Sequence, residues 1–393
     1  MKIKKLLKEK IEVLKPHFSE KGKFSFLHST FNAFETFLFV PDAVTEKGCH
    51  IKDAIDSKRT MIIVVFALIP CLLFGMYNTG YQHFLILEEE KTFLEIFFFG
   101  FIKVLPLIIV SYVVGLSIEF IIAQIRKHEV NEGFLVTGML IPLIVPIDIP
   151  LWMLAIATAF AVLIGKEIFG GTGYNILNPA LTARAFLFFA FPAYMTGDKI
   201  WISNLINGDI TVDATSGETL LSQAINNGSH YVNSIGETIS LKEIIIGTIP
   251  GSVGETSILA IAIGALLLLF TGVASWRIML SVLLGGSFVG ALFNFWGSSP
   301  LMTIPWYEHL CLGGFAFGVV FMATDPVTGC SSNIGKIIYG FLIGALAILI
   351  RVANPAYPEG MMLAILIMNI VAPLIDHIVV SINIRNRLKR KLI

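Results

Sequence analysis

Residues 99–124 read FGFIKVLPLIIVSYVVGLSIEFIIAQ, an apolar run in which Lys103 and Glu119 are the only charged side chains. About 20 consecutive apolar residues are enough for a helix to cross the hydrocarbon core of a bilayer. Every backbone polar group in lipid needs an internal partner, so a helix is the spanning element for a run of this length. The stretch therefore predicts a transmembrane helix.

The composition of the whole chain agrees with this prediction. Of 393 residues, 55% are hydrophobic and 14% are charged, and there are 31 Phe. Such a composition excludes an ordinary soluble domain and predicts an all-α polytopic membrane protein. With a formal net charge of zero, we expect no nucleic-acid partner.

Further apolar runs are long enough, or nearly so, to span a bilayer. We predict about ten transmembrane helices, some of them short or broken. With residues 99–124, the runs lie near residues 61–79, 133–147, 151–169, 179–195, 256–273, 276–295, 304–322, 335–351 and 360–380.

The basic residues predict the orientation. Residues 1–60 contain twelve Lys and Arg, and the segment from Arg385 to Lys391 contains five. Because positive charge favours the cytoplasmic side, we expect both termini to be cytoplasmic and the number of spans to be even. Lys166, at the end of the fourth run, then also lies on the cytoplasmic side. The loop of residues 193–255, with seven acidic residues and two lysines, falls outside.

An internal repeat divides the chain into two halves. Asn178-Pro179-Ala180 precedes the fifth span, and Asn354-Pro355-Ala356 precedes the tenth. Gly133 to Gly138 has a looser counterpart in Gly314 to Gly318. Five helices per half would make the second repeat inverted in the membrane, and such folds place their sites near the midplane.

The predicted organisation has five parts. They are a cytoplasmic amino-terminal region (1–60), a first five-helix repeat (61–195), an extracytoplasmic loop (196–255), a second five-helix repeat (256–380) and a basic cytoplasmic tail (381–393).

The linker after the fourth run is rich in glycine and asparagine. Gly171 and Gly173 allow a ligand to approach the backbone closely. Asn175 and Asn178 offer donors and acceptors that suit an uncharged heteroaromatic ring. Alternatively, the asparagines cap a helix that Pro179 begins. The residues alone leave both interpretations open.

Three acidic residues lie in or beside predicted spans: Glu119, Asp325 and Asp376. A charge at the bilayer centre costs at least about 2.5–3.5 kcal/mol, so each is a functional candidate, and Glu119 is a candidate for ion or quinone handling. Asp325 and Asp376 lie near predicted cytoplasmic ends, where they could be solvated or could pair with Lys336 or Arg385.

The chain also contains two arginines in or at the end of predicted spans, and four cysteines. Arg184 and Arg351 could be structural counterions of the three acids. Cys49, Cys71, Cys311 and Cys330 lack the paired spacing of a zinc or iron–sulfur site, so we expect no metal centre in this chain.

A hydroxyl-rich segment, Asp213-Ala214-Thr215-Ser216-Gly217-Glu218-Thr219, lies in the long loop. Its composition is compatible with an ordinary turn. Thr219, preceded by Ser216 and Gly217 and by Asp213, also resembles the acceptor threonine to which a flavin transferase joins FMN through a phosphoester.

Longer blocks resemble the B subunits of bacterial sodium-translocating NADH:quinone oxidoreductases. They run nearly end to end and include Asp56 to Arg59, Gly165 to Gly173, Asn178 to Ala190, Phe321 to Val327 and Asn354 to Met362. The related D subunits of ion-translocating electron-transport complexes share the membrane core, but the long basic amino-terminal region is similar to the sodium-pump subunits.

This resemblance implies specific roles for residues. Thr219 matches the covalent FMN site, although Glu218 stands where the family pattern Ser-Gly-Ala-Thr has alanine. Asn175 and Asn178 match a loop associated with noncovalent riboflavin, and Gly115 a region linked to the quinone site. The acids Glu119, Asp325 and Asp376 match residues implicated in sodium uptake.

The resemblance also implies a function and partners. Electrons would pass from covalent FMN through riboflavin to ubiquinone or menaquinone, coupled to Na+ export across the bacterial inner membrane. No dinucleotide-binding fingerprint is visible, so NADH oxidation belongs to another subunit. Expected partners are subunits A, C, D, E and F of a six-subunit complex, with a flavin transferase for maturation.

Two other classes of function stay open on the sequence. The inverted architecture is also that of urea channels, and fold does not decide function, so a channel or secondary transporter is the alternative. A scaffold for flavin-bearing neighbours is the third possibility.

Overall fold

The computed structural model describes residues 57–126, 133–196, 201–203, 217–354, 357 and 359–391, and before these only residues 11, 13–18, 31, 45, 48 and 49. Most of the predicted amino-terminal region lies outside this set. No β-strand occurs in the part described, where Val232 and Thr238 form an isolated bridge. The all-helical class is therefore confirmed.

Six helices in this part are long and apolar enough to cross a membrane, and they fit a multi-pass membrane protein. They are α3 (Ser57–Ile86), α4 (Phe93–Arg126), α6 (Leu151–Leu163, continued by turns to Phe169), α11 (Trp276–Trp296), α15 (Asn333–Ala353) and α16 (Met361–Lys391). Three apolar helices are shorter: α5 (Phe134–Ile144), α7 (Pro179–Ala190) and α10 (Ile258–Phe270).

The run predicted as a span at residues 304–322 is not one continuous helix. It is divided into α13 (Trp306–Cys311), α14 (Phe315–Phe317) and the π-helical turn η4 (Gly318–Met322). Pro305 and the left-handed Gly313, with φ of +62°, interrupt the helical hydrogen bonding around α13. The ten-span arrangement and its inverted repeats thus stay predictions.

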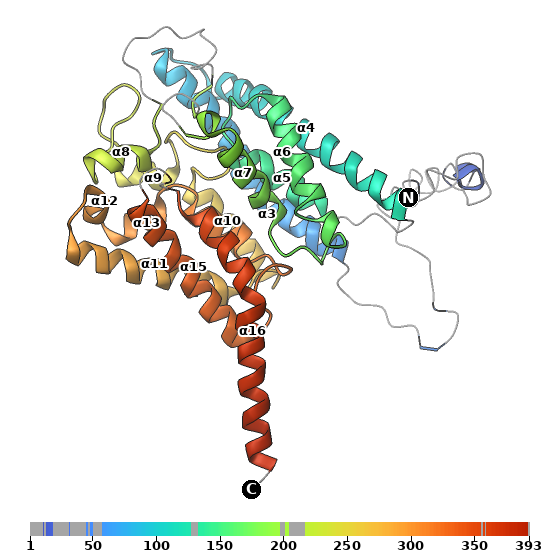
Figure 1. Ribbon diagram of the computed structural model, residues 1–393. Helices are drawn as coiled ribbons and strands as arrows, with labels where there is room; N and C mark the ends of the chain where they lie inside the picture. The colour runs from blue at the N-terminus through green and yellow to red at the C-terminus, as the bar shows by residue number, and fades with distance from the viewer. Residues whose placement is uncertain are drawn as a thin grey trace.

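Helices from the two halves of the chain lie side by side (Figure 1). In the first half α4 packs against α3 and α6, and in the second α15 packs against α11 and α16. Contacts between α3 and α10, and between α7 and α16, join the halves. Residues far apart in the sequence therefore meet between them.

Glycines bring several helix backbones close together. A Cβ on Gly100 of α4 would overlap the carbonyl oxygen of Met76 on α3. A Cβ on Gly344 of α15 would overlap the carbonyl oxygen of Val282 on α11. Small residues at such crossings allow the close packing on which membrane helices depend.

The loop between the halves contains two short helices, α8 (Leu220–Asn227) and α9 (Leu241–Ile246). Helix α9 begins with a capping box in which Ser240 and Glu243 each accept a hydrogen bond from the other's backbone. At the other end of the chain, α16 continues to Lys391 through the predicted basic tail and projects beyond the other helices (Figure 1).

Candidate functional site: a cavity between the halves and a pocket at Thr219

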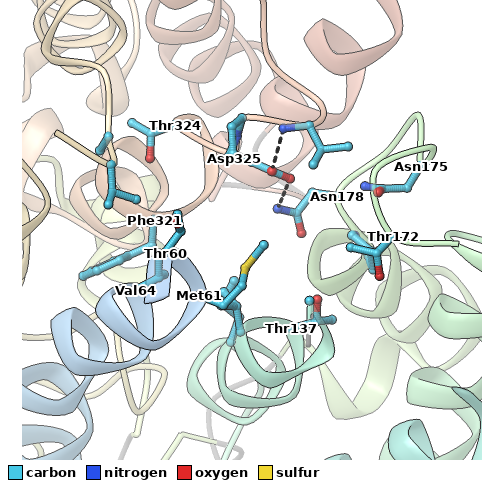
Figure 2. Close-up of a pocket in the computed structure, with 18 of the residues that line it drawn as sticks. Thr60, Met61, Val64, Thr137, Thr172, Asn175, Asn178, Phe321, Thr324 and Asp325 are labelled. Atoms are coloured by element: carbon cyan, nitrogen blue, oxygen red, sulfur yellow. Dashed lines mark hydrogen bonds between the residues drawn. The ribbon is translucent and has the colours of Figure 1, made fainter. Parts of the chain in front are cut away.

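A cavity of about 100 Å³ lies between the two halves (Figure 2). Helices α3 and α5 and the α6–α7 loop form its walls from the first half. The end of α10, η4 and the segment after η4 form its walls from the second. The lining side chains include Thr60, Met61, Val64, Thr137, Leu140, Lys166, Thr172, Asn175, Asn178, Leu268, Phe321, Thr324, Asp325 and Val327.

Asn178 has two roles at this cavity. Its Oδ1 accepts hydrogen bonds from the backbone N–H groups of Ala180 and Leu181, at 3.0 and 3.4 Å, so Asn178 caps α7. Its Nδ2 donates to Oδ2 of Asp325, 3.3 Å away (Figure 2). The capping interpretation is thus correct for Asn178, and it leaves the other end of the amide facing the cavity.

Asp325 is held by three hydrogen bonds. Besides Asn178, its carboxylate accepts from the backbone N–H of Val327 at 3.1 Å and from Oγ1 of Thr328 at 3.0 Å. These neutral donors take the place of the basic partner considered from the sequence. The structure therefore brings a predicted sodium residue and a predicted riboflavin residue into direct contact.

The glycine-rich loop uses the backbone freedom of its glycines. Gly171 and Gly173 have φ values of +95° and +93°, a region that side-chain-bearing residues rarely adopt. The turns deliver Thr172 and Asn175 to the cavity wall, where Asn175 donates from Nδ2 to the Leu177 carbonyl oxygen at 3.1 Å.

Glu119 is paired with Lys166. The ammonium group donates directly to the Glu119 carboxylate, and both side chains are 4% exposed. Lys166 also lines the cavity. In the sequence, Lys166 contributes only to the predicted orientation, as a positive charge on the cytoplasmic side. It is not among the predicted site residues. The available signal was a single lysine placed directly after a long apolar run.

Gly115 lies on the same buried face of α4 as Glu119, one helical turn earlier. A Cβ at this position would overlap the ring of Phe134, the first residue of α5. Gly115 therefore permits the contact between α4 and the Phe134 ring, whatever binds nearby.

Asp376 does not line the cavity. Its carboxylate accepts hydrogen bonds from the backbone N–H groups of Ser331 and Ser332, at 2.6 and 3.1 Å, and from the Ser332 hydroxyl. Ser332 is the N-cap of α15, so Asp376 supports the start of that helix. The three predicted sodium residues therefore do not form one cluster.

The two arginines have partners other than the three acids. Arg184 on α7 bonds Oε1 of Glu255 at 2.6 Å and also the carboxylate of Glu359. Arg351 on α15 donates to the carbonyl oxygens of His309 and Leu312, at 2.7 and 3.1 Å. The pairing of these arginines with Glu119, Asp325 or Asp376 was therefore wrong.

Thr219 is partly buried at the N-terminus of α8. Its Oγ1 accepts a hydrogen bond from the backbone N–H of Ser222 at 3.3 Å, so Thr219 is the N-cap. The side chain also lines a small pocket with Ser252, Glu255, Thr256 and Glu359. Gly217 is buried just before it, whereas Asp213 and Ser216 lie outside the described residues.

Comparison with known proteins identifies the family. A family model described as the NQR2, RnfD, RnfE family matches residues 44–385. The chain belongs to this family. It is 47% identical to the B subunit of the Na(+)-translocating NADH-quinone reductase of Stutzerimonas stutzeri (strain A1501), over 97% of this chain and 98% of that protein. The proteins of the same name from Yersinia pestis and Neisseria meningitidis are 46% and 44% identical, over 98% of this chain and 99% of each relative.

Membership of the NQR2, RnfD, RnfE family confirms the resemblance seen in the sequence blocks. The relatives are named as subunits of an oxidoreductase complex, so the prediction of an enzyme subunit is confirmed as well. In the described part of the chain, no three His, Cys, Asp or Glu side chains are grouped as ligands of a metal ion.

Proposed function

We propose that this chain is the membrane subunit of a sodium-translocating NADH-quinone reductase that carries FMN on Thr219 and riboflavin in the cavity between the halves. The function is transfer of electrons from the covalent FMN through riboflavin to ubiquinone or menaquinone, coupled to Na+ export. The family and the names of the relatives support it. The flavins supply the redox chemistry, and the chain supplies attachment, positioning and electrostatics.

The observation that carries this proposal is the position of the Thr219 hydroxyl. Oγ1 lies at the N-terminus of α8, beside the backbone N–H of Ser222. Such an N-terminus favours negative charge, because its unpaired N–H groups and the helix dipole point toward it. The residues present therefore fit a phosphoester at Thr219.

The lining of the cavity between the halves suits an uncharged ring system. Val64, Leu140, Leu268 and Phe321 supply apolar walls, and Asn175 and Thr172 supply an amide and a hydroxyl. Apolar walls with a few fixed polar groups are typical of cofactor sites. Asn175, Asn178 and the loop glycines Gly171 and Gly173 are the residues that we assign to riboflavin.

We assign sodium entry to the part of the cavity beside Asp325 and Glu119. Lys166 neutralises Glu119, and Asp325 is held by neutral donors. Asp376, whose oxygens support the start of α15, has a secondary place in this proposal. We place the quinone region near Gly115, on the Glu119 face of α4.

The remaining elements of the proposal follow the family. They are ten spans in two inverted five-helix repeats, cytoplasmic termini and an extracytoplasmic Thr219 loop in a bacterial inner membrane. The partners are subunits A, C, D, E and F, and a flavin transferase completes maturation. The order of α3 to α7 and α10 to α16, with α4 against α6 and α11 against α15, supports the two repeats.

The test is intact mass and in-gel flavin fluorescence of the denatured chain, after coexpression with a flavin transferase. Wild type is compared with Thr219→Ala and, as matched control, Thr215→Ala in the same segment. An adduct of FMN mass less water that only Thr219→Ala removes supports the proposal. An unmodified wild-type chain overturns it and favours the channel or transporter function.

A further inference from the structure

We propose that the pocket beside Thr219 binds one Na+ ion through the hydroxyl oxygens of Ser252 and Thr256 and the carboxylates of Glu255 and Glu359. The site stands on the geometry of the pocket. It rests on the proposed function in two respects, which are the choice of Na+ among hard cations and the negative charge that a phosphoester on Thr219 would add.

Two buried hydroxyl groups in this pocket have no partner among the described residues. They are Oγ of Ser252 and Oγ1 of Thr256, on side chains that are 2% and 3% exposed. A buried hydroxyl without a hydrogen bond is costly, so natural proteins satisfy nearly all of them. Both residues line the pocket, which indicates that a ligand in contact with their hydroxyl oxygens belongs there.

The charges at the pocket do not cancel. Arg184, 2% exposed, binds both Glu255 from the loop before α10 and Glu359 from the segment before α16. One guanidinium thus meets two carboxylates, and one negative charge is left over within this ion cluster. The guanidinium of Arg351, next to Gly313 of the same pocket, is bound to carbonyl oxygens instead. Glu255 is itself 6% exposed, so solvent screens little of that charge.

Size and ligand type together select a small hard cation. The pocket has a volume of about 20 Å³, enough for one water-sized ligand. Its side-chain donors are all oxygen atoms and include no His or Cys, a set that suits a hard cation rather than zinc or copper. The excess negative charge favours a cation over a free anion, and a water molecule would satisfy the hydroxyls without neutralising it.

A phosphoester at Thr219 would strengthen this site. Thr219 lines the same pocket as the four ligands, so a phosphoryl group on Oγ1 would add negative charge at its edge. Opposite charges attract more strongly where solvent is excluded. We therefore expect tighter Na+ binding in the flavinylated chain than in Thr219→Ala.

The experiment is equilibrium binding of radioactive ²²Na+ to the purified complex in choline buffer. Glu255→Gln leaves Arg184 with one carboxylate, and we expect it to remove one Na+ per complex. Ser252→Ala and Thr256→Val each remove a hydroxyl but leave the ion cluster intact. Each should raise the dissociation constant of that one site about tenfold.

Ser234→Ala is the matched control, because Oγ of Ser234 is also buried without a partner in the described part but lies outside this pocket. It should bind Na+ like the wild type. Unchanged binding in Ser252→Ala and Thr256→Val overturns the inference even if Glu255→Gln does not fold. Proton uptake without ²²Na+ binding also overturns it.

The same samples separate this inference from the proposed function. The mass of the denatured chain reports the FMN adduct independently of Na+. A missing adduct in wild type contradicts the proposed function, whereas a normal adduct with unaltered Na+ binding in the hydroxyl variants contradicts only the cation site.

Discussion

Nδ2 of Asn178 donates a hydrogen bond to Oδ2 of Asp325, and this contact joins residues 147 positions apart in the sequence. Asn178 caps α7 in the first half, and Asp325 follows η4 in the second. Both residues line the cavity in which we place riboflavin. The candidate flavin site and the candidate sodium residue are therefore mechanically and electrostatically connected.

Asn178→Ser tests this connection, because serine keeps a side-chain oxygen for the α7 cap but cannot reach Asp325. We expect a loss of about 1.5–3 kcal/mol in unfolding free energy, as for a hydrogen bond to a charged group. Asn178→Asp also keeps the cap but places two carboxylates together, so its loss should be larger. Thermal unfolding in detergent measures both.

Asn175→Ser is the control for that series. The Asn175 amide donates to the carbonyl oxygen of Leu177, two residues away in the same loop, so stability should stay close to wild type. We expect riboflavin content per chain to fall in the Asn175 and Asn178 variants alike. Equal stability of Asn178→Ser and Asn175→Ser would contradict the role of the cross-half bond.

The Lys166–Glu119 pair predicts a non-additive pair of substitutions. Glu119→Gln or Lys166→Met alone removes one member of a buried ion pair, which costs about 3–5 kcal/mol. The double variant removes both charges and should recover most of the stability. A double-mutant cycle on unfolding midpoints gives the coupling. Additive losses would mean that the two side chains do not depend on each other.

Removal of the Glu218 carboxylate should speed the attachment of FMN to Thr219. A carboxylate beside the acceptor hydroxyl repels the phosphate of the incoming flavin nucleotide. Glu218→Ala, which restores the family pattern, should therefore be flavinylated faster by the transferase. Glu218→Gln should behave similarly if charge is the cause. In-gel fluorescence over time measures the rate, and a faster rate in Glu218→Ala alone would point to side-chain size instead.

A side chain at position 115 should cause a steric clash with Phe134 that a second substitution relieves. The new methyl group of Gly115→Ala would meet the Phe134 ring, which must move, at a cost of about 1–3 kcal/mol. Shortening that ring with Phe134→Leu should recover part of the loss. Unfolding midpoints of the two single variants and the double variant test this. A double variant as unstable as the sum of the singles would exclude the contact as the cause.

Local patterns in the sequence were enough for much of the fold. Apolar runs such as residues 99–124 and 335–351 became α4 and α15, because a helix satisfies its own backbone hydrogen bonds within the run. Asn178 followed by Pro179 likewise predicted the start of α7. The run at 304–322 failed as a continuous helix, since its apolar character reveals neither the left-handed conformation of Gly313 nor the π-helical turn that follows.

The composition and the sequence blocks by themselves determined the all-helical class and the family, because both depend on the identity and order of neighbouring residues. Only the tertiary structure decided the partners of the charged groups. Lys166 meets Glu119 across 47 positions, and Arg184 meets Glu255 across 71. Charge pairing between packed helices depends on which faces meet in three dimensions, and spacing along the chain does not contain that information.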